Sequence, residues 1–395
     1  MGWLAETLAV TWLNLRTVPQ RLGSSTVAIV GIAGVVVVLV AVLSIAEGFQ
    51  AAMRGAGSDA RAIVMRSGSD SEMTSGLSGP ETDIIKQAPG IRRDGITAVA
   101  SAELFVIINL PKKSTGTAAN VPLRGIEPAA LQVRDEASIV AGRMFQFGTN
   151  EVVVGRAASG QFAGLELGSK IVSGQLTWVV VGLFEDDGSV AETEIWCDAR
   201  TLQGAYRRGN SYQSMLVHLE SAGAFGGFKD WLTANPQLNV SVMRETEYYA
   251  SQSQTLTTLI RTIGFAIAGL MAIGAVFGAI LTMYTAVATR SREIATLRAL
   301  GFNATAVLVS VLTESLALAA LGGLAGGLAA YAGFNGYQTS TMNFQTFSQV
   351  AFAFRVTPNL LLMGLLWSLG MGLVGGLLPA VRASRLPIAT ALREL

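Results

Sequence analysis

Enzymatic or metal chemistry needs clustered reactive side chains, and this sequence offers few. It has one cysteine, Cys197, and one histidine, His218, too few for a disulfide framework or a His/Cys metal cluster. Both lie in apolar segments, where packed or hydrogen-bonded roles are expected. Glu185-Asp186-Asp187 could offer oxygen ligands to calcium, although such a turn is more often only solvated. No catalytic set appears, so a stand-alone membrane enzyme is disfavoured, and no metal or cofactor bound by this chain is expected.

The segment 290–303, RSREIATLRALGFN, combines charge with an apolar stripe. Gly301 is a natural helix stop. A short amphipathic helix here could dock in a groove of another protein, and a basic loop that touches only lipid headgroups is the alternative. The residues of interest are Arg290, Arg292, Glu293, Ile294, Leu297, Arg298 and Gly301.

Glu314 is the one acid inside a long apolar run. A carboxylate in hydrocarbon is costly, so it should face a partner or water. It could set the packing of neighbouring spans or simply reach water near the interface. A proton relay is less favoured because the apolar cores of the spans hold no second charged residue.

Composition and charge patterning indicate a membrane protein that carries a soluble insert. Of the 395 residues, 51% are hydrophobic and 14% charged, and the mean hydropathy is +0.47, whereas soluble domains carry about 25% charged residues. Residues 47–260 hold 23 Asp/Glu and 18 Lys/Arg, and the rest of the chain holds 4 acids and 10 bases.

Four apolar runs are long enough to cross a bilayer, and they predict an α-helical membrane protein with one span, a large insert and three further spans. A signal peptide is disfavoured for the first run, because 23 residues precede it and the run exceeds an h-region. The predicted spans are 24–47, 258–289, 304–336 and 358–381.

The segments between the spans give the orientation. Basic residues gather in 1–24, 290–304 and 382–395, while 337–357 carries only Arg355. By the positive-inside rule both termini are expected in the cytoplasm, with 48–257 and the short loop 337–357 outside. Residues 1–23 have an apolar helical stripe and are expected to form an interfacial amphipathic helix.

Glycine pairs at four-residue spacing recur in the later spans. Such pairs let helices approach closely in lipid. Packing within one chain and contact with a second chain are both open. The pairs are Gly274/Gly278, Gly322/Gly326, Gly323/Gly327 and Gly372/Gly376.

The insert, 48–257, alternates short Val/Ile-rich runs with turn signals, which predicts an α+β domain. Strands are expected at 103–110, 151–155, 170–174, 176–184, 213–219 and 238–243, and helices at about 80–88, 156–163, 198–207 and 222–234. The Ser/Gly-rich segment 66–80 is expected to be a linker.

Several strings along the chain carry a family resemblance. In the C-terminal third they are REIATLRALGF (292–302), VLTESLALAALGGLAGG (311–327) and GLLPAVRASRLPIATALREL (376–395). The last string carries the tail residues Pro379, Arg382, Arg385 and Arg393. Earlier in the chain they are AEGF (46–49), EVVVGRAASGQFAGLELGSKI (151–171) and WVVVGLFEDDGSVAETEIWCD (178–198). In this order the strings resemble the FtsX/MacB superfamily of ABC transporter permeases.

The resemblance implies a permease subunit that works with a separate P-loop ABC ATPase, which would bind the ATP and Mg. In agreement, the chain has no G-x-x-x-x-G-K-[ST] string. The segment 290–301 would be the coupling helix in the ATPase groove. The insert would divide into two lobes, about 48–100 with 212–257, and 101–211.

The partners implied are a second permease copy or a paralogue, a periplasmic adaptor (membrane fusion) protein and membrane lipid, with no nucleic acid. The expected setting is the bacterial cytoplasmic (inner) membrane. Export driven from the periplasmic side is the leading function, since the insert is large. An FtsX-like signalling permease that activates a cell-wall hydrolase, or a permease that extracts lipoproteins or lipids, are the alternatives.

Overall fold

The computed structural model describes residues 7, 11, 12, 22–55 and 57–388. The chain divides into two compact units. The helical bundle comprises Met1–Glu47, Leu259–Tyr337 and Phe354–Leu395, and the inserted domain comprises Gly48–Thr258 and Gln338–Ala353. The predicted interfacial helix at 1–23 and the tail residue Arg393 lie largely or wholly outside the described residues.

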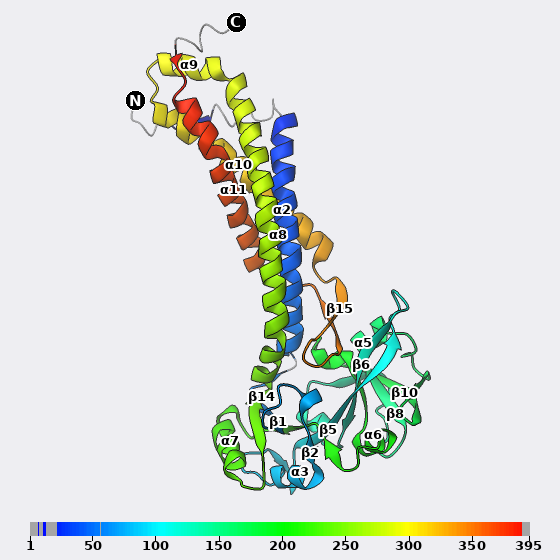
Figure 1. Ribbon diagram of the computed structural model, residues 1–395. Coiled ribbons are helices and arrows are strands. Elements are labelled where there is room, and N and C mark those ends of the chain that lie inside the picture. Colours follow the sequence, from blue (N-terminus) through cyan, green and yellow to red (C-terminus); the bar gives the residue numbers. More distant parts are fainter. Residues whose placement is uncertain (1–6, 8–10, 13–21, 56, 389–395) are drawn as a thin grey trace. The chain divides into compact units, whose positions relative to one another are not determined.

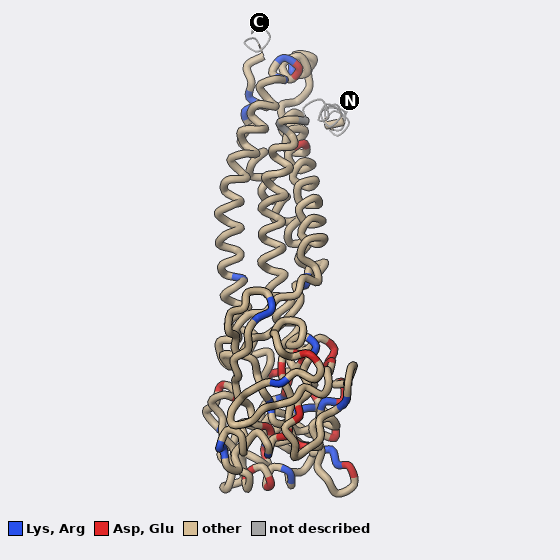
Figure 2. The backbone as a smooth tube through the Cα atoms, turned by 90° about the vertical axis from the view of Figure 1, so that its right-hand side faces the viewer, with Lys and Arg blue, Asp and Glu red and all other residues tan. Residues whose placement is uncertain are grey.

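Four helices are long and apolar enough to cross a membrane, and they have the predicted one-plus-three order around an α+β insert (Figure 1). They are α2 (Leu22–Gly55), α8 (Glu245–Thr289), α10 (Ala304–Phe334) and α11 (Pro358–Ser384). A short helix, α9 (Ser291–Ala299), connects α8 to α10. Figure 2 shows that charged residues are sparse along the four long helices and dense in the inserted domain.

Local signals in the sequence set where these helices begin and end. The Asn303 side chain accepts a hydrogen bond from the Thr305 amide at the start of α10. The Thr357 hydroxyl does the same for Leu360 at the start of α11, where Pro358 occupies the first turn. After α9 the chain turns at Gly301, whose φ of 98° favours glycine.

Glycines let the bundle helices approach closely. A Cβ on Gly326 of α10 would lie 2.6 Å from the carbonyl oxygen of Ala33 in α2, and one on Gly372 of α11 would lie 2.4 Å from the Ala319 Cβ. Gly322, Gly323 and Gly376 are similarly crowded. By contrast, no atom in the described part of the chain lies within 4 Å of the Cβ position of Gly274 or Gly278 in α8. Most of the glycine pairs therefore serve packing within the chain, whereas the α8 pair is open.

The inserted domain is built on a ten-stranded mixed sheet of order β14-β1-β13-β5-β6-β11-β8-β10-β7, with β9 also paired to β10. The pairs β11–β6 and β10–β8 are parallel and the others antiparallel. The strands of this sheet are β1 (Arg61–Arg66), β5 (Ala100–Pro111), β6 (Ala118–Ile126), β7 (Ser138–Gly142), β8 (Glu151–Gly155), β9 (Lys170–Ser173), β10 (Leu176–Glu185), β11 (Ile195–Asp198), β13 (Ser214–His218) and β14 (Val240–Arg244).

Short elements connect and cover this sheet. The short strands are β2 (Leu77–Ser78), β3 (Arg93–Asp94), β4 (Thr97–Ala98) and β12 (Ser211–Tyr212). The helices are α3 (Gly79–Ile85), α4 (Ala130–Val133), α5 (Arg156–Gln161), α6 (Ala199–Ala205) and α7 (Phe225–Ala234), with 3-10 turns η2 (Glu72–Thr74), η3 (Val190–Thr193) and η4 (Ala222–Ala224). The strands and helices predicted in this domain are all confirmed within a few residues.

Two large hydrophobic cores stabilise the inserted domain. One is formed mainly by β5, β6, β8, β10 and β11 together with α5 and α6. It contains Phe162, Trp178 and Ile195, all buried. The other contains Met215, Phe228 and Leu232 and is formed by residues 62–100 together with 215–242. The strand β5 runs continuously from the second core into the first, because its residue Ala100 lies in one and Leu104 in the other.

The segment between α10 and α11 differs from the short loop expected at 337–357. It forms a hairpin of β15 (Gln338–Met342) and β16 (Gln349–Ala353), and this hairpin belongs to the inserted domain. The strand β15 has the sequence QTSTM, which is polar except for its last residue. It therefore lacks the apolar alternation from which a strand could have been predicted.

Candidate functional site

The helix α9, which carries the predicted coupling residues, is fixed to the bundle by its apolar side. Ile294 is 8% exposed and packs with Met283 and Val287 of α8 and Val307 and Val311 of α10. Ala295 beside it is also buried. The apolar stripe seen in the sequence therefore contacts the chain's own helices.

A buried ion pair lies beneath α9. Arg290, at the junction of α8 and α9, donates from Nη1 to the Glu314 carboxylate at 3.3 Å and from Nε to Glu293 at 3.2 Å. The side chains of Arg290 and Glu314 are only 10% and 5% exposed. The acid that sequence analysis singled out thus has a charged partner, supplied by the connection between two helices. That partner was not predicted.

The opposite face of α9 is open to solvent. Arg292, Glu293 and Thr296 are exposed there, and Leu300 just beyond the helix is 73% exposed. The seven predicted coupling residues therefore differ in exposure. Arg292 and Glu293, and Gly301 beyond the helix, are exposed. Arg290 and Ile294 are buried, and Leu297 and Arg298 are half-buried. Contact of any of them with an ATPase stays a prediction.

The C-terminal end of α11 and the residues after it also contact this region. Arg298 of α9 donates to the carbonyl oxygen of Leu386 at 2.9 Å. The Arg382 guanidinium lies 5.3 Å from the centre of the Tyr284 ring in α8, a cation–π contact. Pro379 is buried inside α11, and Arg385 is exposed.

In the inserted domain, a buried ion pair ties the first strand to the start of α8. Arg61 opens β1 and donates to the carboxylate of Glu245, the first residue of α8, at 2.5 Å. Both side chains are at most 4% exposed, and Arg61 also pairs with Glu136. The Glu245 carboxylate accepts a further hydrogen bond from the Ser58 amide at 3.1 Å. The chain therefore enters and leaves the domain at two points held together by this pair, and we call residues 58–61 with Glu245 the neck of the domain.

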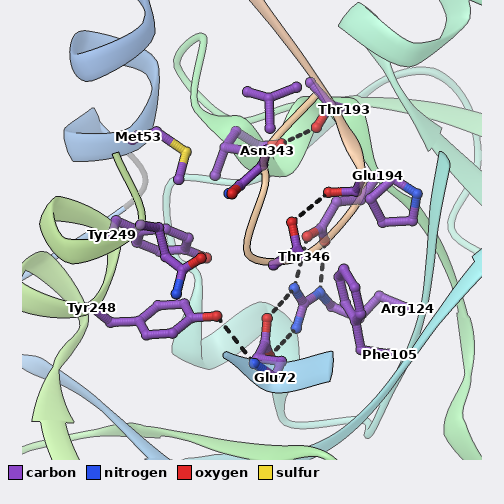
Figure 3. A pocket seen from close by; sticks show the side chains of 15 residues that line it. Met53, Glu72, Phe105, Arg124, Thr193, Glu194, Tyr248, Tyr249, Asn343 and Thr346 are labelled. Atoms are coloured by element: carbon purple, nitrogen blue, oxygen red, sulfur yellow. Dashed lines mark hydrogen bonds and ion pairs between the residues drawn. The ribbon is translucent and has the colours of Figure 1, made fainter. Parts of the chain in front are cut away.

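A second buried cluster lies at the centre of the domain around Arg124 of β6 (Figure 3). Its guanidinium makes paired hydrogen bonds at 2.7–2.8 Å to Glu72 and to Glu194. It also bonds Glu103 of β5 at 2.8 Å, and Arg134 holds the same Glu103 at 2.6 and 2.8 Å. All five side chains are at most 7% exposed.

Mutual pairing keeps Glu103 and Arg124 charged despite their burial. Burial alone would raise the pKa of Glu103, but Arg134 and Arg124 outweigh it and hold that pKa below its ordinary value. Burial likewise opposes the charge of Arg124, and Glu194, Glu72 and Glu103 raise its pKa well above the usual range. A charge within an apolar strand such as VPLRGI is the signal that could have predicted this cluster.

The other candidate residues are accounted for by structural contacts. The Glu192 carboxylate accepts hydrogen bonds from the amides of Asp186 and Gly188 at 2.9 and 2.8 Å. These bonds stabilise the backbone of the acidic turn 185–187. His218 contacts the carbonyl oxygen of Leu219 at 2.8 Å. Cys197 is fully buried, and burial raises the pKa of its thiol well above normal. Among the described residues, no group of three or more His, Cys, Asp or Glu could hold a metal ion.

Similarity to known proteins assigns the family. Residues 25–234 match the model of the MacB-like periplasmic core domain, and residues 265–388 match that of the FtsX-like permease C-terminal domain. The chain is 34% identical over 116 residues to YvrN of Bacillus subtilis (strain 168), an uncharacterized ABC transporter permease. That match covers 29% of this chain and 26% of YvrN, so the chain aligns with about a quarter of that relative.

Two crystal structures show a weaker likeness. The periplasmic region of MacB from Actinobacillus actinomycetemcomitans is 14% identical with a TM-score of 0.37, and covers 53% of this chain and 95% of that structure. The extracellular domain of the noncanonic ABC-type transporter YknZ from Gram-positive bacteria is 16% identical with a TM-score of 0.35, and covers 47% and 100%. Because both TM-scores are low, the assignment rests on the sequence models. The chain belongs to the MacB/FtsX family of ABC transporter permeases.

Proposed function

We propose that this chain is the non-catalytic membrane subunit of an ABC-type exporter, and that α9 is its docking helix for a separate ATPase. The observation that carries the proposal is the two-sided character of α9. Its apolar side is held by Ile294 and by the Arg290–Glu314 pair, while Thr296 and Leu300 are exposed to solvent. Because α9 is fixed to α8 and α10 in this way, a displacement of α9 by a bound ATPase would move these helices with it as a rigid unit.

The direction of transmission follows from the chain's connections. α8 runs without a break from the junction with α9 to Glu245 at the neck of the inserted domain. A displacement at α9 therefore reaches the domain through one continuous helix and the Arg61–Glu245 pair. We place α9 and both termini in the cytoplasm and the inserted domain in the periplasm or outside the cell, because of the positive-inside rule.

A second permease completes this assembly. We place a second copy, or a paralogue, against the face of α8 that carries Gly274 and Gly278. Among the described residues, nothing lies within 4 Å of a Cβ built on either glycine, and large apolar side chains such as Leu270 and Phe277 are exposed on the same helix. Small residues at this spacing promote close helix packing in lipid.

The work would be done on the far side of the membrane, on a substrate or a partner protein already there. Export through an assembly with a periplasmic adaptor is the form we propose, because the inserted domain, with two cores and a ten-stranded sheet, is large enough to offer a partner an extended surface. Activation of a cell-wall hydrolase and extraction of lipoproteins or lipids would use the same transmission path.

Co-purification tests this proposal. The tagged chain, extracted in mild detergent, should bring down a P-loop ATPase together with an adaptor protein, identified by mass spectrometry. Leu300→Asp should abolish recovery of the ATPase, and the matched Leu300→Met should retain it. Recovery of a cell-wall hydrolase in place of an adaptor would favour signalling. Absence of any ATPase with the wild-type chain would contradict the proposal.

A further inference from the structure

The hairpin between α10 and α11 is an unexpected part of the inserted domain. We call residues 338–353 the clasp. Its two strands, β15 and β16, pair in register from Gln338–Ala353 to Met342–Gln349, and the tip 343–348 connects them. The chain leaves α10 at Phe334, passes through the clasp and enters α11 at Pro358. The clasp is therefore a covalent connection between these two helices and the domain, separate from α2 and α8.

The return strand of the clasp packs on the end of α2 that belongs to the inserted domain. At Gly48 a Cβ would lie 2.1 Å from the carbonyl oxygen of Ala353 and 3.2 Å from the ring of Phe352. Phe49 and Phe352 meet edge to face with centroids 5.6 Å apart, and both are buried. Only glycine at position 48 allows this approach without displacing the strand.

The tip of the clasp is buried over the Arg124 cluster although its residues are polar. Asn343, Thr346 and Ser348 are 3%, 7% and 3% exposed. They line a small cavity of about 30 Å³ together with Glu72, Arg124, Glu194 and Tyr248 (Figure 3). The Ser71 hydroxyl donates to the carbonyl oxygen of Gln345 at 3.1 Å.

The tip also holds a strained backbone. Phe347 has a φ of 52°, in the left-handed region that bulky residues rarely adopt. Its carbonyl oxygen accepts from the Asn120 side chain of β6 at 2.7 Å. Such strain persists only where surrounding contacts impose it, so the tip is held in a defined position on the domain.

From these contacts we infer that the clasp is a mechanical link, which couples the α10–α11 hairpin to the inserted domain at Gly48 and at the Arg124 cluster. The inference rests on the proposed function. In a permease driven from α9, the domain then responds to the pair α10 and α11 as well as to α8. The paired hydrogen bonds of Arg124 to Glu72 and Glu194 hold the side chains beneath the tip in fixed positions.

Hydrogen exchange of the full-length chain tests whether the clasp is docked. Gly48→Ala should speed exchange of the clasp amides by roughly tenfold, the factor that corresponds to about 1.4 kcal/mol of overpacking strain. Gly34→Ala in the same helix is the matched control, because none of the residues that the structure describes comes within 4 Å of its Cβ position. Asn120→Ala is a second variant, which loosens the tip without changing α2. Unchanged exchange in both test variants would overturn the inference.

The same variants, in complex with the co-purified ATPase, test transmission. ATP should change exchange in β5 and β6 of the wild-type chain and of Gly34→Ala, and this change should shrink at least by half in Gly48→Ala and Asn120→Ala. A full ATP response in both variants, with the clasp loosened, would overturn the clasp's role while leaving the proposed function intact. If no ATPase binds the wild-type chain, the proposed function fails, and the transmission role fails with it.

Discussion

The Nη1 atom of Arg290 lies 3.3 Å from the Glu314 carboxylate, at a point where α8 ends, α9 begins and α10 passes. Both side chains are nearly buried, and the apolar residues Met283, Val287 and Val311 surround them. A charge in such surroundings is stable only when it is paired. The pair therefore fixes the angle at which α9 leaves α8, and it ties that angle to α10.

Breaking this pair should weaken both folding and coupling. Glu314→Gln removes the buried negative charge beside Arg290, and we expect it to cost about 1–3 kcal/mol, because the buried guanidinium then loses its buried countercharge and keeps the exposed carboxylate of Glu293. Thermal unfolding of the detergent-solubilised chain measures this loss. Glu293→Gln is the control, since its side chain is 66% exposed and its pair with Arg290 lies near the surface. Equal stability of the two variants would contradict a structural role for Glu314.

Glycines of the bundle should differ in their tolerance of alanine. Gly326→Ala places a methyl group against the backbone of α2 and should lower stability by about 1–3 kcal/mol through overpacking. At Gly278→Ala the added methyl group has no described residue within 4 Å, and the thermal midpoint should be unchanged or slightly higher, because alanine favours helix. The two midpoints are compared in a detergent that keeps the chain monomeric. A larger loss for Gly278→Ala than for Gly326→Ala would contradict the packing described.

The Arg124 cluster predicts a specific acid sensitivity. The folded pKa of Glu103 lies below its ordinary value, which is about 4.3 in unfolded chains. Its carboxylate therefore contributes stability that is fully present above that pH and is lost as the pH falls through the folded pKa. Glu103→Gln should lower the thermal midpoint at pH 7 and flatten its fall below about pH 4. Glu220→Gln, at an exposed site of the same domain, should keep the wild-type profile.

Cys197 should resist thiol reagents in the folded chain. It is fully buried, and burial raises its pKa well above normal, so little thiolate forms at neutral pH. Maleimide labelling, followed by mass spectrometry, should be slow without denaturant and complete once the domain unfolds. Rapid labelling of the native chain would show that the core around β11 is open.

Periodicity and charge placement predicted much of this fold. The predicted strands at 151–155 and 176–184 are confirmed as β8 and β10. Val-rich segments bounded by glycine favour a strand, and this signal is local. The four spans followed from length and hydropathy alone. In both cases the signal lies within one contiguous segment of the sequence.

The rest depends on contacts between distant segments, which one sequence does not reveal. Glu314 was singled out by its cost in lipid, but its partner Arg290 lies 24 residues earlier, beyond a helix break. The clasp was missed because its strand β15 is polar on both faces. Arg124 and Glu103 stand in apolar strands, and their pairing depends on the register of β5 against β6.

Site-specific photo-crosslinking from α9 tests the central claim most directly. A photoreactive amino acid at position 296, which is exposed on α9, should crosslink in intact membranes to a P-loop ATPase, and ATP binding should change the yield. The same group at position 172, on an exposed strand of the inserted domain, should give no ATPase adduct. Crosslinks from position 296 to lipid alone would contradict the assignment of α9 as the docking helix.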